Sequence, residues 1–104
     1  MKYNNLLDSV RHLLMLKTNE RILINGRYSC KLTEKVPFKV FERNQNCPSY
    51  ESSAFVTITN TDTIARIDVN YNVDLNNVSC MLVFYNFNDQ PISMTTITDL
   101  EFFK

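Results

Sequence analysis

Apolar and polar residues alternate strictly over residues 65–73, and this pattern constrains the fold more than any other feature of the sequence. Alanine, isoleucine, valine and tyrosine occupy the odd positions, and arginine, aspartate and asparagine occupy the even ones. A period of two is typical of a strand with one buried face and one solvated face. Further strand-like segments, separated by short turns, fill residues 20–103, and short turns favour antiparallel pairing because parallel strands need long crossovers. We therefore predict an antiparallel sheet of about six to seven strands in a meander-like order.

The N-terminal residues follow a helical period instead. Six apolar side chains fall within an arc of about 120° on a helical projection: Tyr3, Leu6, Leu7, Val10, Leu13 and Leu14. Asn5 is a suitable N-cap, and Asp8 suits the positive end of the helix dipole. The pattern predicts one helix over residues 5–17, packed on the sheet in an α+β fold. With 104 residues, the chain has the size of a single domain spanning 1–104.

Asn25-Gly26 lies between two apolar runs and predicts a β-hairpin. A type I′ turn needs positive φ at both central residues, and Gly26 is the only glycine in the chain. After the turn, alternation places Arg27, Ser29 and Lys31 on one face of the strand, opposite Tyr28, Cys30 and Leu32.

Four further segments follow from local composition. Residues 36–42 and 54–59 read as strands, and residues 78–87 are so apolar that they predict a central strand covered on both faces. Residues 43–53 form the longest polar stretch and are the best candidate for a mobile loop. Ser and Thr residues recur along two later segments and mark an exposed sheet face or an edge; they are Thr57, Thr59, Ser93, Thr95, Thr96 and Thr98.

The formal net charge of zero hides a strongly polarised chain. Residues 1–43 contain nine Lys and Arg against four Asp and Glu, whereas residues 44–104 contain two against seven. Five of the bases recur at every fourth position: Arg27, Lys31, Lys35, Lys39 and Arg43. If the turn between the strands preserves their facing, Arg27, Lys31 and Lys39 share an outer face with Phe41. We expect this face to contact a partner.

Two interpretations of the basic half remain open. One is an exposed surface for an acidic protein or for nucleic-acid phosphates. The other is that the two halves pair in one sheet, where bases and acids lie side by side as solvated pairs. The zero net charge weighs against nucleic acid, because nucleic-acid binders usually carry net positive charge.

His12, Met15 and Leu16 form a second candidate surface. On a helix over residues 5–17, all three fall on the polar face, and a partner or a second copy of the chain would cover the two apolar side chains. His12 also lies four residues after Asp8, but a surface hydrogen bond explains that spacing better than a catalytic pair.

No catalytic, cofactor or metal signature is present. Cys30 and Cys80 lie in apolar strands and are expected to be buried and inert, while Cys47 lies in the predicted loop as an ordinary exposed thiol. Three widely spaced cysteines suit neither a disulfide framework nor zinc. A single glycine excludes a glycine-rich phosphate loop.

The residues therefore predict a non-enzymatic protein-binding module without a cofactor, of the inhibitor, immunity or accessory type. The alternatives are a nucleic-acid-binding accessory protein and a small structural subunit of a virion or a larger assembly. No signal peptide or membrane span is recognisable, so we expect a cytoplasmic location. The abundance of Asn, Lys, Ile, Tyr and Phe is typical of phage, viral or low-GC bacterial genes.

Overall fold

One helix and eight strands make up the described part of the chain. The computed structural model describes residues 1–17, 19–34, 41–42, 49–59, 61, 63–72 and 77–103, with the backbone alone at residues 34, 41–42 and 49–50. The elements are α1 (Leu6–Leu14), β1 (Arg21–Ile24), β2 (Tyr28–Glu34), β3 (Phe41–Glu42), β4 (Ser49–Ile58), β5 (Thr63–Asn72), β6 (Asn77–Tyr85), β7 (Pro91–Thr96) and β8 (Leu100–Phe103). The sheet runs β7-β6-β5-β4-β2-β1-β8, with every pairing antiparallel, and β3 pairs with β4 beside this path. The predicted α+β architecture with a largely meandering sheet is confirmed.

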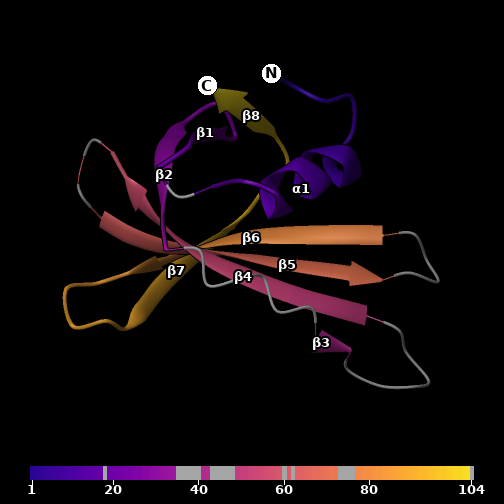
Figure 1. Ribbon diagram of the computed structural model, residues 1–104. Helices are drawn as coiled ribbons and strands as arrows, with labels where there is room; N and C mark the ends of the chain where they lie inside the picture. The colour runs from indigo at the N-terminus through magenta and orange to yellow at the C-terminus, as the bar shows by residue number, and fades with distance from the viewer. Residues whose placement is uncertain are drawn as a thin grey trace.

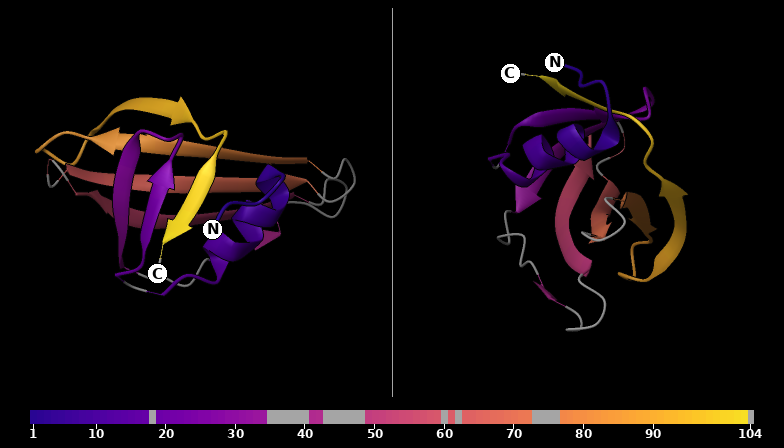
Figure 2. Two further views of the ribbon diagram at one scale, coloured as in Figure 1. Left: turned by 90° about the horizontal axis from the view of Figure 1, so that it is seen from above. Right: turned by 90° about the vertical axis from the view of Figure 1, so that its right-hand side faces the viewer.

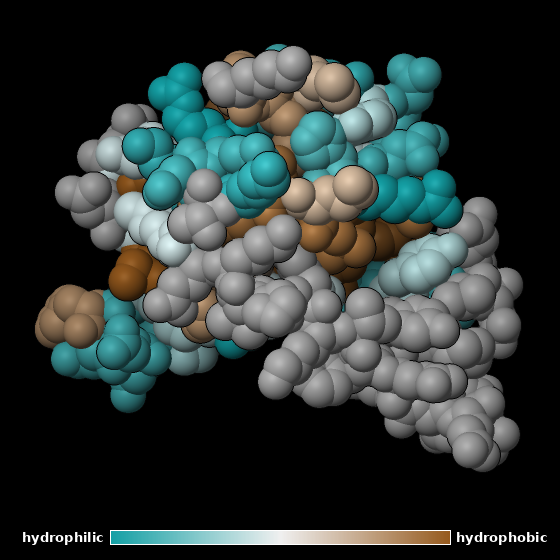
Figure 3. Space-filling view, in the orientation of Figure 1, coloured by the Kyte–Doolittle hydropathy of each residue, from teal (hydrophilic) through white to brown (hydrophobic). Residues whose placement is uncertain are grey.

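The sheet curls so that its two ends form separate layers. Strands β2, β1 and β8 lie over one face of β4, β5 and β6, and α1 lies beside β8 on the same side (Figures 1 and 2). The pairing of β2 with β4 contains a register shift between Leu32 and Glu34, and such irregularities increase local bend and twist. Apolar atoms show through between the polar upper layer and the strands below it (Figure 3).

The core lies between these layers. It is built from every second residue of the strands together with one side of the helix, and its largest fully buried members are Leu13, Ile22, Ile24, Leu32, Ile67, Leu82, Ile97 and Leu100. The alternation that predicted β5 is confirmed, because Ala65, Ile67 and Val69 are buried and the residues between them are not. We call the core-bearing side of the sheet its inner face and the opposite side its outer face.

The helix begins as predicted and ends earlier than predicted. The Asn5 side chain accepts a 2.8 Å hydrogen bond from the Asp8 N–H, as an N-cap should. The last helical residue is Leu14, and the N–H of Leu16 donates to the carbonyl of Leu13 in a tighter turn. The backbone leaves the helical path at this point, so the side chain of Leu16 enters the core.

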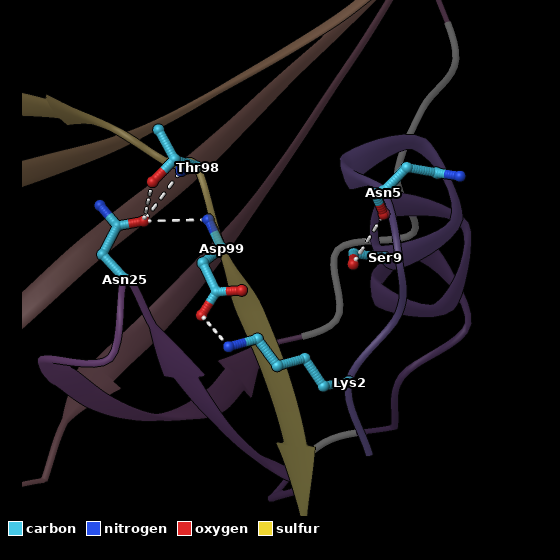
Figure 4. Close-up of polar contacts among 6 residues, drawn as sticks. All are labelled: Lys2, Asn5, Ser9, Asn25, Thr98 and Asp99. Atoms are coloured by element: carbon cyan, nitrogen blue, oxygen red, sulfur yellow. Dashed lines mark hydrogen bonds and ion pairs between the residues drawn. The ribbon is translucent and has the colours of Figure 1, made fainter.

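The Asn-Gly hairpin is confirmed, and Asn25 has a second role in it. Asn25 and Gly26 have φ angles of 55° and 64°, as a type I′ turn requires. The Asn25 side chain also joins the hairpin to the connection between β7 and β8. Its Oδ1 accepts from the N–H of Thr98 at 2.8 Å and of Asp99 at 3.2 Å, and its Nδ2 donates to the carbonyl of Thr96 at 2.9 Å. Figure 4 shows the contacts to Thr98 and Asp99.

Two predictions about the later strands are wrong. Residues 49–53 belong to β4 rather than to a loop, because their backbone pairs with β5 from Ser49↔Asn72 onwards although their side chains are mostly polar. Strand β6 is not central: it is second from the β7 edge. Its outward side chain Val83 is nevertheless buried, and it is flanked on that face by Arg66 and Met94 of the neighbouring strands.

Candidate partner-binding site

Arg21 and Lys31 face each other on the outer face of the sheet. The register of β1 and β2 pairs them directly, and both side chains are exposed. In an antiparallel pair, side chains directly opposite each other have Cβ atoms about 5 Å apart. Their inward neighbours Ile22 and Cys30 are fully buried. Packing of the inner face therefore fixes this register and holds the two cations together.

The strands on either side supply no acid to this position. The β8 residue opposite Arg21 is Phe103, and the β4 residue opposite Lys31 is Thr57, which in turn faces Ile64 on β5. We call these five side chains the basic row. Phe103 and Ile64 are 41% and 51% exposed, so an aromatic ring and an aliphatic side chain lie at its two ends. The row offers positive charge beside accessible apolar surface.

The described residues contain three ion pairs, and none involves the basic row. Lys2 pairs with Asp99 at 3.3 Å, Arg11 with Asp8 at 3.7 Å, and Arg66 with Asp68 at 2.7 Å. Within the described chain, only the first of these pairs joins the basic half of the sequence to the acidic half. Strands β1 and β2 lie next to strands from the acidic half. Within the described residues, however, no acid of that half forms an ion pair with Arg21 or Lys31.

The residues expected to form a basic face are only partly brought together. Lys31 lies on the outer face as predicted. Arg27 lies in the turn, and its guanidinium carbon is 5.2 Å from the centre of the Tyr28 ring, which packs against Phe84 on the inner face. The backbone of Phe41 lies in β3. Lys35, Lys39 and Arg43 lie outside the described residues, as does Cys47.

Arg21 was missed as a candidate, and the reason is the length of the turn. A two-residue Asn-Gly loop would pair Ile24 with Arg27 and so place Arg21 opposite Cys30. In the structure Ile24 pairs with Tyr28, which moves Arg21 opposite Lys31. Arg27 becomes an extra residue of the loop, and its N–H donates to the carbonyl of Ile24 at 3.0 Å. A one-residue change of register is enough to exchange the neighbours of a strand residue. The apolar alternation of β1 and β2 together was the signal that could have revealed this pairing.

The second predicted surface is corrected at Leu16. Leu16 is 2% exposed and belongs to the core, whereas Met15 is 78% exposed as expected. His12 lies between these extremes. Its ring stacks on Phe102 at 4.1 Å between centroids, and Nδ1 lies 2.6 Å from the hydroxyl of Tyr3. A shallow surface groove is lined by His12 and Met15 together with Tyr3, Asp8, Arg11 and Glu20.

No serine or cysteine of the described chain lines this groove. The nearest serine on the helix, Ser9, is buried, and its hydroxyl donates to the carbonyl of Asn5 at 3.1 Å. The thiols of Cys30 and Cys80 are fully buried as predicted, and burial raises the pKa of each to about 12. A thiol that stays protonated at neutral pH is a poor nucleophile.

Other kinds of site find no support in the described part of the chain. No three His, Cys, Asp or Glu side chains there lie close enough to hold a metal ion, and no helix there has the length and apolar character that a membrane crossing requires. Comparison with protein families, with curated proteins and with solved structures finds no match for this chain.

Proposed function

We propose that this chain is a non-enzymatic protein-binding module that masks an acidic surface of a partner protein through the basic row. The observation that carries the proposal is that Arg21 and Lys31 face each other and form no ion pair with any described residue. Two like charges directly opposite each other destabilise a sheet. A partner carboxylate placed between them would relieve that repulsion, which gives the bound state an electrostatic gain that the free chain lacks.

The ends of the basic row suit a protein surface. Phe103 and Ile64 add accessible apolar contact on either side of the two cations. Aromatic residues and arginine are enriched in protein interfaces, where a few such residues supply most of the binding energy. An inhibitor, an immunity protein and an accessory factor all act by covering a partner in this way.

Affinity capture from the native cell, quantified by mass spectrometry, tests the proposal with two matched variants. Lys31→Glu reverses one charge of the basic row, and Lys17→Glu reverses another exposed charge, which lies three residues beyond the end of the helix. We expect one protein to be captured by the wild type and by Lys17→Glu but not by Lys31→Glu. Equal capture by all three chains would refute the proposal.

Nucleic acid is the second candidate, and the position of Phe103 beside Arg21 favours it. An exposed ring next to a cation can stack on a base while the cation contacts a phosphate. This alternative predicts binding of single-stranded oligonucleotides that weakens steeply with salt and is reduced by Phe103→Ala. Absence of binding at low salt would remove it.

A further inference from the structure

One edge strand of the sheet is covered by another segment of the chain, and the other edge strand is not. The β8 edge is covered by the first residues of the chain: Lys2 forms a bridge with Glu101, and Met1 and Phe102 exchange backbone hydrogen bonds in both directions. The ion pair between Lys2 and Asp99 fastens the same segment (Figure 4). At the opposite edge, β7 pairs with β6, and no other strand of the described chain pairs with it.

Strand β7 carries the features that usually protect an open edge only at its start. Natural edge strands carry charged side chains, bulges or proline that discourage pairing with another chain. Pro91–Thr96 contains no charged residue, and its proline lies at the first position. A register shift leaves Ile92 as an extra residue between the pairs Tyr85↔Pro91 and Phe84↔Ser93, and the pairing from Ser93 to Thr96 is regular. Two of its apolar side chains, Ile92 and Met94, are 62% and 65% exposed.

The alternation of hydrogen bonds along β7 makes the backbone N–H and C=O of Met94 point away from β6. Just beyond the strand, the N–H of Ile97 donates to the carbonyl of Cys80 at 2.7 Å. Bonded and non-bonded pairs alternate in an antiparallel ladder, so Met94, which pairs with Val83, directs its N–H and C=O away from β6. The backbone N–H and C=O of Thr96, two residues further on, also point away from β6. The carbonyl of Thr96 already accepts a hydrogen bond from the side chain of Asn25.

We propose that β7 pairs antiparallel with β7 of a second copy of this chain, about a two-fold axis close to Met94. Such an axis places the free N–H and C=O of each Met94 against outward groups of the other strand, so that the same edge serves both copies. The strand has no charge, so self-pairing brings no like charges opposite each other. The chain as a whole has a formal net charge of zero and does not repel its copy.

The contact also buries the exposed side chains of Ile92 and Met94. An interface limited to one strand edge is smaller than the roughly 1,200–2,000 Å² of a stable complex. The dimer is therefore weak and forms in a concentration-dependent way.

Sedimentation velocity over a wide range of protein concentration tests this proposal. The wild-type mass rises from that of a monomer towards twice that value, while Met94→Lys, which brings two like charges together at the axis, remains monomeric. The matched control is Met15→Lys, because Met15 is the same residue type and is still more exposed. It should associate as the wild type does, and all three chains should melt at similar temperatures.

Hydrogen exchange of the wild type provides a second measurement that needs no variant. The Met94 amide should exchange quickly in dilute solution and more slowly as the dimer forms. A wild type that stays monomeric at every concentration would overturn the proposal. So would association that survives Met94→Lys, association lost equally in Met15→Lys, or exchange at Met94 that does not depend on concentration.

Discussion

Arg21 and Lys31 lie directly opposite each other on β1 and β2, and neither forms an ion pair with any residue that the structure describes. Their backbones are held in this register by the buried side chains on the other face of both strands. The repulsion between the two cations is therefore built into the fold. It should lower stability slightly, because like charges directly opposite each other in a sheet are destabilising.

Reversing the charge of Lys31 should stabilise the folded protein. The Lys31→Glu side chain replaces a repulsive cross-strand pair by an attractive one, which should add about 0.2–1 kcal/mol to the free energy of unfolding. Urea unfolding at low and high salt measures this gain, which should shrink at high salt because both groups are exposed. Reversing Arg21 as well recreates a like-charge pair and should abolish it. A Lys31→Glu protein less stable than the wild type would show that another neighbour controls this position.

Replacing Asn25 with glycine should separate its two roles. Glycine adopts positive φ freely, so the turn itself is preserved. The hydrogen bonds from the side chain to residues 96–99 are lost, and we expect Asn25→Gly to lower the free energy of unfolding by about 1–3 kcal/mol. Asn25→Asp keeps the acceptor but not the donor to Thr96, so it should lose less. Equal stability of Asn25→Gly and the wild type in urea unfolding would mean that Asn25 acts through the turn alone.

Adjacent residues after the helix should respond very differently to truncation. Leu16→Ala removes a core side chain and should cost about 2–5 kcal/mol. Met15→Ala removes a side chain that is 78% exposed and should change stability by less than about 0.5 kcal/mol. Thermal unfolding of the two variants checks the end of the helix. Similar melting temperatures for both would contradict the position of Leu16 in the core.

The buried thiols should make the protein less stable in alkaline solution. In the unfolded chain Cys30 and Cys80 lose their protons near pH 9, whereas in the folded chain each keeps its proton up to about pH 12. The unfolded state therefore binds fewer protons in this window, and stability falls as pH rises through it, by up to about 1.4 kcal/mol per pH unit for each thiol.

Thiol labelling gives a direct check at lower pH. In a Cys47→Ser background, both remaining thiols should resist a disulfide reagent at pH 8 and react once urea unfolds the chain. Rapid labelling of the folded protein would contradict the burial of Cys30 and Cys80.

Sequence patterns predicted the elements well where side chains alternate and less well where backbone geometry decides. The period of residues 65–73 predicted β5, and Asn25-Gly26 predicted the hairpin. The polar side chains of residues 49–53 concealed a strand, because hydrogen bonds of the backbone, not side-chain polarity, join it to β5. The early end of α1 depends on a tight turn that places Leu16 in the core, and a helical projection cannot show such a turn.

The candidate site was only partly predictable for a similar reason. Spacing along the chain grouped Lys31 with Arg27, which in the structure lies in the turn. The actual neighbour of Lys31 depends on the one extra residue in the hairpin loop and on packing of the inner face. The order of the strands depends on long-range pairing, so the contribution of Phe103 from β8 could not be read from local patterns.

The most direct test of the basic row combines stability and partner capture for one variant, Lys31→Glu. If the row serves binding, this protein should unfold at a slightly higher temperature than the wild type and yet fail to retain the partner that the wild type and Lys17→Glu both capture. Retention of that partner by a stably folded Lys31→Glu protein would contradict a binding role for the Arg21–Lys31 pair.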